Sequence, residues 1–141
     1  MLQTWHDLQI VFAAIGVVIG GFLGGIDGFM YTLIAFMIID YVSGVMVAVS
    51  DRSLSSAVGF RGICRKVLIL ALVGMGNLLD VYVIGTGAVI RTAVIFFFLS
   101  NEGLSVLENA GKLGLPIPDK LRNVLAQLRD DEAEGEENGG F

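Results

Sequence analysis

The chain has 141 residues, of which 55% are hydrophobic and 16% are charged, a more apolar composition than soluble domains usually have. Six of the fourteen acidic residues lie within residues 130–141, and the rest of the chain has nine bases and eight acids, so the formal net charge of −5 describes the tail and not the body. This composition argues against a soluble fold, and the single cysteine, Cys64, excludes an intrachain disulfide and a cysteine-based zinc site.

Four hydrophobic segments follow one another along the chain, at about residues 8–25, 29–49, 67–84 and 88–107. Each approaches the length of roughly 20 residues that a helix needs to cross a bilayer. Only Ile26-Asp27-Gly28 separates the first two segments, and only Gly85-Thr86-Gly87 separates the last two. The sequence therefore predicts an all-α integral membrane protein with four transmembrane helices in two hairpins. The alternative is three spans, with the first segment lying in the membrane interface.

Glycines recur at every fourth position through the first segment, as Gly16, Gly20, Gly24 and Gly28. This spacing removes side chains from one stripe of a helix and lets another helix approach closely. The stripe predicts helix packing, either within the chain or between copies of it.

Six polar or charged residues interrupt the last three apolar segments: Asp40, Asn77, Asp80, Arg91, Asn101 and Glu102. A charge at the bilayer centre costs roughly 2.5 kcal/mol or more, so these side chains need partners or water. Asp80 and Arg91 flank the second hairpin turn by similar distances, which places them at similar depth and predicts an ion pair. Glu102 is expected near the bases that begin the third segment. Asp40 has no obvious partner, which favours a functional role for it, whereas the other groups serve equally well to fix helix packing.

Basic residues gather in two regions of the chain. The loop between the second and third segments contains Arg52, Arg61, Arg65 and Lys66, and the region after the fourth segment contains Lys112, Lys120, Arg122 and Arg129. Under the positive-inside rule both regions are cytoplasmic, and an even number of spans places the N-terminus there as well.

The C-terminal region divides by composition. Residues 1–115 form the predicted transmembrane domain, and residues 116–129 form a predicted cytoplasmic amphipathic helix, with apolar positions Leu121, Val124, Leu125 and Leu128 at helical spacing. Residues 130–141 are acidic and glycine-rich, which predicts a disordered tail.

Catalytic chemistry finds no support in the sequence. His6 is the only histidine, and the chain contains no nucleophile–base set, metal-spaced cluster or phosphate-binding glycine loop. We therefore expect a protein that is not an enzyme and needs no cofactor or metal. The basic loop is too short and too close to the membrane to predict nucleic-acid binding.

An ordered series of motifs runs from the second hydrophobic segment to the end of the fourth and beyond. It consists of Asp40-Tyr41-Val42-Ser43-Gly44, Gly59-Phe60-Arg61-Gly62, Arg65-Lys66, Leu78-Leu79-Asp80, Arg91-Thr92, Asn101-Glu102-Gly103-Leu104-Ser105-Val106-Leu107-Glu108-Asn109 and Gly114-Leu115-Pro116-Ile117-Pro118. This series resembles the holins of phage lysis and clostridial toxin secretion. The resemblance covers about residues 40–128, and the glycine-rich first segment and the acidic tail lie outside it.

The resemblance implies a small phage or prophage protein that accumulates in the bacterial cytoplasmic membrane, forms homo-oligomers and opens pores. The lesions would release an endolysin during host cell lysis or a signal-less toxin during secretion, and an antiholin is a further expected partner. Three other readings stay open: a small oligomeric ion channel or transporter subunit, an antiholin that regulates a partner holin, and a membrane scaffold.

Overall fold

The computed structural model describes the backbone of residues 1–138 and the side chains of residues 1–127 and 130, and this part consists of helices joined by short loops. The elements are α1 (Leu2–Leu23), α2 (Gly28–Ser50), α3 (Ser56–Leu78), a π-helical turn η1 (Leu79–Ile84), α4 (Val89–Lys112) and α5 (Asp119–Asn138). Four helices are long and apolar enough to cross a membrane, with α3 and η1 forming one continuous span. The predicted fold class of four spanning helices and a C-terminal helix is confirmed.

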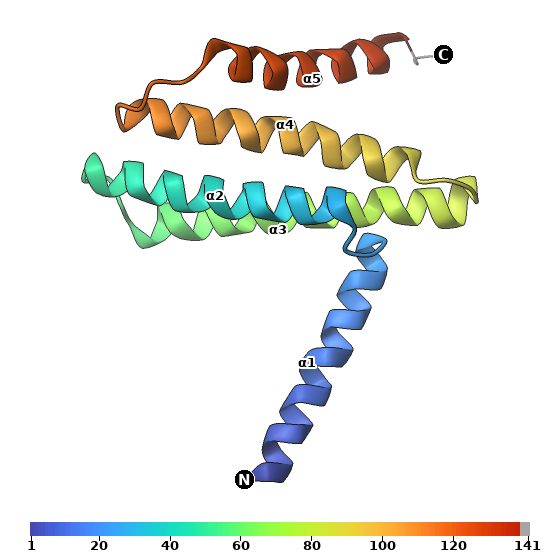
Figure 1. Cartoon of the computed structure of the whole chain (residues 1–141). Coiled ribbons are helices and arrows are strands. Elements are labelled where there is room, and N and C mark those ends of the chain that lie inside the picture. The colour runs from blue at the N-terminus through green and yellow to red at the C-terminus, as the bar shows by residue number, and fades with distance from the viewer. Residues whose placement is uncertain (139–141) are drawn as a thin grey trace.

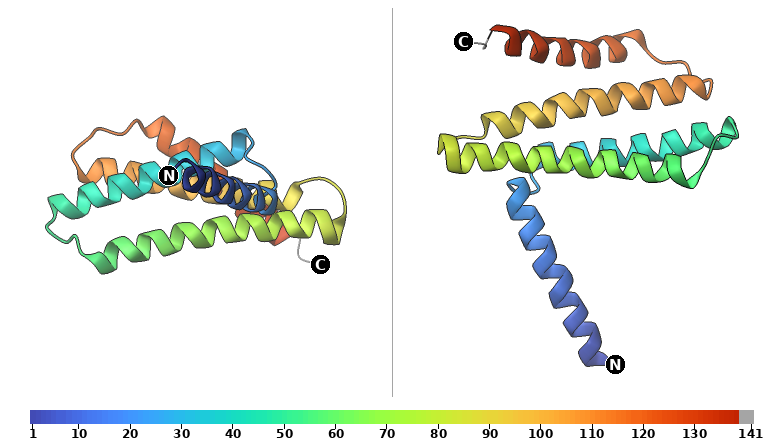
Figure 2. Two further views of the ribbon diagram at one scale, coloured as in Figure 1. Left: turned by 90° about the horizontal axis from the view of Figure 1, so that it is seen from below. Right: turned by 180° about the vertical axis from the view of Figure 1, so that it is seen from behind.

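Helices α2, α3 and α4 lie side by side and form the body of the molecule (Figures 1 and 2). Helix α4 packs against both α2 and α3. The buried apolar core comes from all four candidate spans and consists of Leu23, Met30, Leu33, Met37, Ile69, Val73 and Ile95. Exposed apolar side chains cover the outside of the bundle, as expected of a surface that faces lipid rather than water.

The second predicted hairpin forms, whereas the first does not. Helices α3 and α4 run antiparallel through a short connection in which Gly85 and Gly87 have positive φ angles of 86° and 76°. In contrast, α1 leaves the bundle steeply (Figure 1) and packs against α3, with no packing on α2 in the described chain. The prediction of a hairpin between the first two segments is therefore wrong.

The departure of α1 has a local cause. Gly24 and Gly25 have φ angles of 82° and 93°, which end α1, and the Asp27 side chain then accepts a hydrogen bond from the Met30 N–H (2.9 Å) to begin α2. This left-handed ending followed by an N-cap directs the two helices apart. The last turn of α1 is held on α3, where the Phe22 ring fills the space that Gly74 leaves free.

The glycine stripe is not used for packing within the chain. A Cβ atom added at Gly16, Gly20 or Gly28 would meet no atom within 4 Å. Gly24 differs, since it ends α1 in the left-handed region and lies against the Asn77 and Arg91 side chains. Packing of the other three glycines between copies of the chain stays a prediction.

Helix α5 folds back along α4 (Figure 1) and extends further than the sequence predicts. A Cβ atom at Gly103 of α4 would lie 3.1 Å from Leu125 Cδ1, so Leu125 packs into the notch that this glycine leaves. The helix continues to Asn138, whereas the amphipathic helix was expected to end at Arg129 and the tail to be disordered. Alanine and glutamate have high helix propensity, which accounts for the continuation. The side chains of Leu128 and Arg129 and residues 139–141 lie outside the described part.

Candidate functional site

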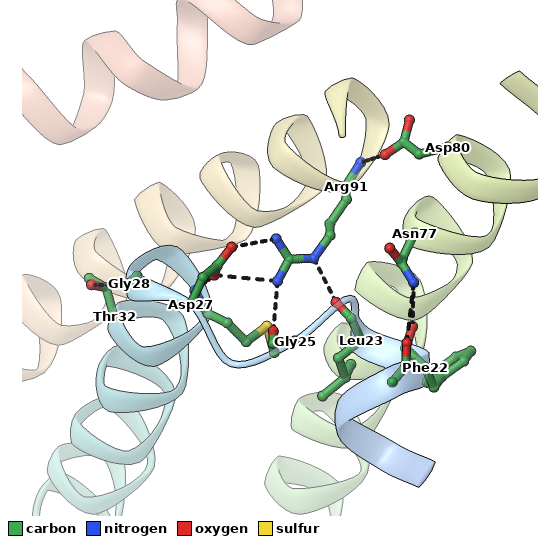
Figure 3. Close-up of polar contacts among 11 residues, drawn as sticks. Phe22, Leu23, Gly25, Asp27, Gly28, Thr32, Asn77, Asp80 and Arg91 are labelled. Atoms are coloured by element: carbon green, nitrogen blue, oxygen red, sulfur yellow. Dashed lines mark hydrogen bonds and ion pairs between the residues drawn. The ribbon is translucent and has the colours of Figure 1, made fainter. Parts of the chain in front are cut away.

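Two polar clusters lie within the apolar bundle. The outer cluster, Asp27, Asn77, Asp80 and Arg91, gathers where α1, η1 and the start of α4 meet (Figure 3). The inner cluster, Asp40, Ser43, Lys66, Glu102 and Asn109, joins α2, α3 and α4 nearer the end of the α2–α3 loop. The two clusters contain five of the six polar residues that the sequence singled out within the apolar segments, and each of the five has a partner on another helix. Asp80 and Arg91 are among the most buried of them.

Arg91 holds the connection between α1 and α2. Its guanidinium donates through Nε to the Leu23 carbonyl (2.6 Å), through Nη2 to the Gly25 carbonyl (2.9 Å) and through Nη1 to Asp27 Oδ2 (2.8 Å). The residue is only 4% exposed. The planar guanidinium has several N–H donors and can reach all three acceptors, which a lysine ammonium would do less well. It also gives hydrogen bonds to carbonyls that have no helical partner where α1 ends.

The predicted ion pair between Asp80 and Arg91 is wrong, although the two residues are neighbours as expected. The Asp80 carboxylate, 1% exposed, accepts the backbone N–H groups of Ile90 (3.1 Å) and Arg91 (2.8 Å). These are among the first N–H groups of α4, which have no helical acceptors. Asp80 thus caps α4, a favourable place for a negative charge, and the Arg91 side chain is free to bind Asp27.

Asn77 and Asp27 complete the outer cluster. Asn77 Nδ2 donates to the Phe22 carbonyl (3.1 Å), so it fastens the last turn of α1 to α3 (Figure 3). The Asp27 side chain is 45% exposed. The Arg91 hydrogen bonds, together with the Met30 N–H, hold the pKa of Asp27 below its usual range.

Lys66 is the centre of the inner cluster. Its ammonium group forms ion pairs with both Asp40 of α2 and Glu102 of α4. Asp40, for which the sequence indicated no partner, therefore shares one with Glu102. As ionised groups the three side chains sum to −1, and they join all three helices of the bundle.

Asn109 extends the inner cluster along α4. Its Nδ2 donates to Ser43 Oγ (2.9 Å) and to Asp40 Oδ1 (3.3 Å), and Ser43 in turn donates to the Asp40 carbonyl (3.0 Å). Each buried side-chain nitrogen and oxygen in the described part has a hydrogen-bond partner. The closed bundle therefore satisfies its own polar groups without water.

The other residues singled out by sequence lie apart from these contacts. Asn101 lines a groove between α3 and α4 of about 540 Å³. Arg52 is exposed in the α2–α3 loop, with a φ angle of 55°. Arg61 and Arg65 are exposed on α3 and line a second cavity close to Lys66.

Sequence reasoning missed Asp27 and Asn109. Asp27 carried two signals, since it directly precedes an apolar helix, as N-caps do, and lies on the same predicted side of the membrane as Arg91. Asn109 lies seven residues after Glu102, close to two helical turns, and therefore on the same face of α4.

The two polar clusters are suited to ion pairs and hydrogen bonds that can be exchanged, and not to metal binding or catalysis. The described residues contain no group of three or more histidine, cysteine, aspartate or glutamate side chains placed to hold a metal ion. Both clusters instead consist of ion pairs and hydrogen bonds between helices, which water could replace if the helices moved apart.

Comparison with known proteins identifies the family. The sequence pattern of the bacteriophage holin family matches residues 17–130. An uncharacterized protein of Listeria innocua is 38% identical over 118 residues, covering 84% of each chain, and one of Clostridium perfringens is 37% identical over 123 residues, covering 87% of this chain and 90% of its own. A protein of Bacillus phage phi105 named "Probable holin" is 28% identical over 131 residues, covering 93% of this chain and 90% of its own. No solved structure matches the chain.

These matches agree with the helical architecture and with the prediction that the protein is not an enzyme. The family match covers the last part of α1 from residue 17, all of α2, α3 and α4, and α5 as far as residue 130, so it includes both polar clusters. A holin is a membrane protein and not an enzyme, as the sequence predicted, and the four apolar helices make this one multi-pass. The chain therefore belongs to the bacteriophage holin family.

Proposed function

We propose that this holin oligomerises in the bacterial cytoplasmic membrane and opens lesions through which an endolysin, or a toxin without a signal sequence, leaves the cell. The observation that carries the proposal is the inner cluster, in which Lys66 binds acids from two other helices. Such a cluster gives an apolar bundle a polar interior that water can enter once the helices separate.

The proposed mechanism is an exchange of contacts. In the closed bundle the charges of α2, α3 and α4 neutralise one another, so the chain can accumulate in the membrane at low cost. As copies gather, contacts between chains replace contacts within the chain, and the charged faces turn towards water. Because each added copy adds both helix contacts and polar lining, opening depends steeply on protein concentration.

Orientation follows from the basic residues. We place the α2–α3 loop and the C-terminus in the cytoplasm under the positive-inside rule, with the N-terminus on the same side if α1 spans. The double variant Gln3→Cys, Cys64→Ser, which has a single cysteine near the N-terminus, tests this placement. It should react with a membrane-impermeant thiol reagent only after the cells are opened, whereas labelling in intact cells would favour a chain with three spans and α1 on the outer surface.

Release of macromolecules distinguishes a lesion from an ion channel. Bacteria that express this chain together with an endolysin and a series of cytoplasmic reporters of increasing size should release all of them abruptly, after a delay that shortens as expression increases. Loss of ions alone, with the endolysin retained at high holin abundance, would favour a channel or transporter subunit. A chain that accumulates without release, and that delays release by another holin, would instead be an antiholin.

A matched pair of variants in α2 tests the role of the inner cluster. Asp40→Leu removes one acid, makes the bundle drier and should delay or abolish release while insertion continues. Ile39→Leu introduces the same residue at the neighbouring position, which is 50% exposed, and should release reporters at the normal time. Equal timing in the two variants at equal abundance would contradict the proposed role of Asp40.

A further inference from the structure

A cavity of about 300 Å³ lies between α2, α3 and α4, at the end of the bundle where the α2–α3 loop joins the helices. Gly44, Gly59 and Gly62 form part of its wall and leave space that larger side chains would fill. The Tyr41 ring packs against Gly62, and its hydroxyl donates to the Gly59 carbonyl (3.4 Å). The cavity is therefore a built feature of the α2–α3 pair, with Tyr41 as a fixed wall.

The cavity carries positive charge that no described acidic side chain neutralises. Arg61 and Arg65 both line it and lie one helical turn apart on α3. Neither forms an ion pair with any residue that the structure describes, and although Arg65 also borders the groove that contains Glu108, the two side chains do not pair. Lys66 and Asp40 line the cavity too, but they are already bound to each other. Two neighbouring guanidinium groups without counterions suit a phosphate, which accepts hydrogen bonds from arginine in pairs.

The remaining walls are apolar. Val45, Ala48, Leu54 and Val58 line the same cavity. A second groove of about 330 Å³ adjoins it at Tyr41 and Lys66, and runs between α2 and α3 towards the middle of the membrane.

That adjoining groove is almost entirely apolar, because isoleucine, leucine, valine and methionine side chains form most of its wall. It extends along α3 from Ile63 to Leu70, a rise of about 10 Å, and Val42 and Val67 at its edge are more than half exposed. Its length and chemistry suit part of an acyl chain.

We infer that this cavity binds the phosphate of an anionic phospholipid from the cytoplasmic leaflet, with an acyl chain in the adjoining groove. Basic pockets between transmembrane helices on this side of a membrane are suited to such headgroups. A soluble anion would use the two arginines but would leave the apolar groove empty. The inference depends on the proposed orientation of the α2–α3 loop, but it does not require that the protein form lesions.

Cys64, exposed and between the two arginines in sequence, provides a site-specific reporter. The full chain, labelled there with a fluorophore, is reconstituted in phosphatidylcholine vesicles that contain a small fraction of lipid with a quencher on its headgroup. Quenching by labelled phosphatidylglycerol should exceed quenching by labelled phosphatidylcholine at the same mole fraction. Arg61→Gln and Arg65→Gln should each reduce this preference about tenfold, the factor that corresponds to ~1.5 kcal/mol for the loss of one hydrogen bond to a charged group.

Two further variants separate a site from general attraction. Arg52→Gln removes the same charge from the α2–α3 loop outside the cavity and should leave the preference unchanged. Ala48→Phe fills the cavity without changing charge and should abolish the preference, while circular dichroism checks that helical content is kept. Equal losses in the Arg52 and Arg61 variants, or full preference in the Ala48 variant, would overturn the inference.

A soluble anion is distinguished in the same system. Inorganic phosphate added to phosphatidylcholine vesicles should change the fluorescence little. If phosphate alters the signal through Arg61 and Arg65 while the two lipids quench equally, the cavity binds a soluble anion and the lipid assignment is wrong. Lipid preference with no reporter release in cells would leave this inference standing and overturn only the proposed function.

Discussion

In the part of the chain that the structure describes, Arg91 and Lys66 are the cations that form ion pairs between helices or their connections, and each does so with a different geometry. Arg91 distributes its donors over two carbonyls and one carboxylate in the α1–α2 connection. Lys66 instead places one charge between two carboxylates. Removing either cation leaves buried acceptors without a partner, which costs more than the intact pair contributes to stability.

Lys66→Met should lower the amount of protein in the membrane, because Asp40 and Glu102 would remain as two unpaired acids. Breaking a buried ion pair costs about 3–5 kcal/mol. Asp40→Asn and Glu102→Gln should each accumulate normally, since either leaves one acid for one base. The variant that combines Lys66→Met, Asp40→Asn and Glu102→Gln should accumulate in the membrane as the native chain does. Immunoblots of membrane fractions measure the amount of each protein. Normal accumulation of Lys66→Met alone would show that the cluster does not support the fold.

Lowering the pH of the solution that the α1–α2 connection contacts should weaken the attachment of α1 to the bundle. The hydrogen bonds from Arg91 give Asp27 a lower pKa in the folded chain than the usual value of 3.8. The contact between Asp27 and Arg91 therefore stabilises the folded chain fully above pH 3.8. This stabilisation is lost as the pH falls through the lower pKa that Asp27 has in the folded chain. Thermal unfolding in detergent should show this loss in the native chain but not in Asp27→Asn. The same acid dependence in both proteins would exclude Asp27 as its source.

At the scale of elements, α1 is attached to the bundle through its last turn only. Phe22 against Gly74, Asn77 bound to the Phe22 carbonyl, and Arg91 bound to the Leu23 carbonyl make up this attachment. The rest of α1 presents exposed apolar side chains. Within the described chain, α1 therefore contributes to the buried core through Leu23 of this last turn and not through its earlier turns.

Two glycine substitutions distinguish the end of α1 that packs on α3 from the α1 glycines that contact nothing in the described chain. Gly74 of α3 lies at the attachment, and Gly20 belongs to the glycine stripe of α1. A Cβ atom at Gly74 would lie 2.0 Å from Phe22 Cε1, so Gly74→Ala should displace α1 and lower the melting temperature in detergent. Gly20→Ala adds the same methyl group in open space and should be neutral or stabilise the chain by up to about 1 kcal/mol. A lower melting temperature for Gly20→Ala than for Gly74→Ala would contradict the observed attachment. Reduced crosslinking between copies in Gly20→Ala alone would assign the stripe to oligomers.

At the scale of the whole molecule, α5 covers part of α4 through Leu125 and Gly103. Its second half is strongly acidic, with six acids from position 130 onwards, and is costly to place in hydrocarbon. The apolar contacts of the first half and the charge of the second half therefore favour different environments. In a bilayer, we expect α5 to keep its acidic half in water.

Deleting residues 130–141 should leave insertion and release intact, because the acidic segment contributes almost no apolar surface. The onset of release should shift, since six negative charges on each copy repel one another when copies gather. Timed release of a cytoplasmic enzyme, at matched abundance of the full and shortened chains, measures both effects. Complete loss of release from a shortened chain that still inserts would contradict this expectation.

Sequence alone determined the number of apolar helices, the closeness of Asp80 to Arg91 and the C-terminal helix with Leu125 on its apolar face. These properties depend on composition and on the rise per residue, which are local. Only the tertiary structure decided which acid Arg91 binds, that Lys66 is shared by Asp40 and Glu102, and that α1 packs on α3 instead of α2. Partner choice depends on how each helix is rotated about its axis and inclined to its neighbours, which is set by contacts such as Phe22 on Gly74 between residues far apart in the chain.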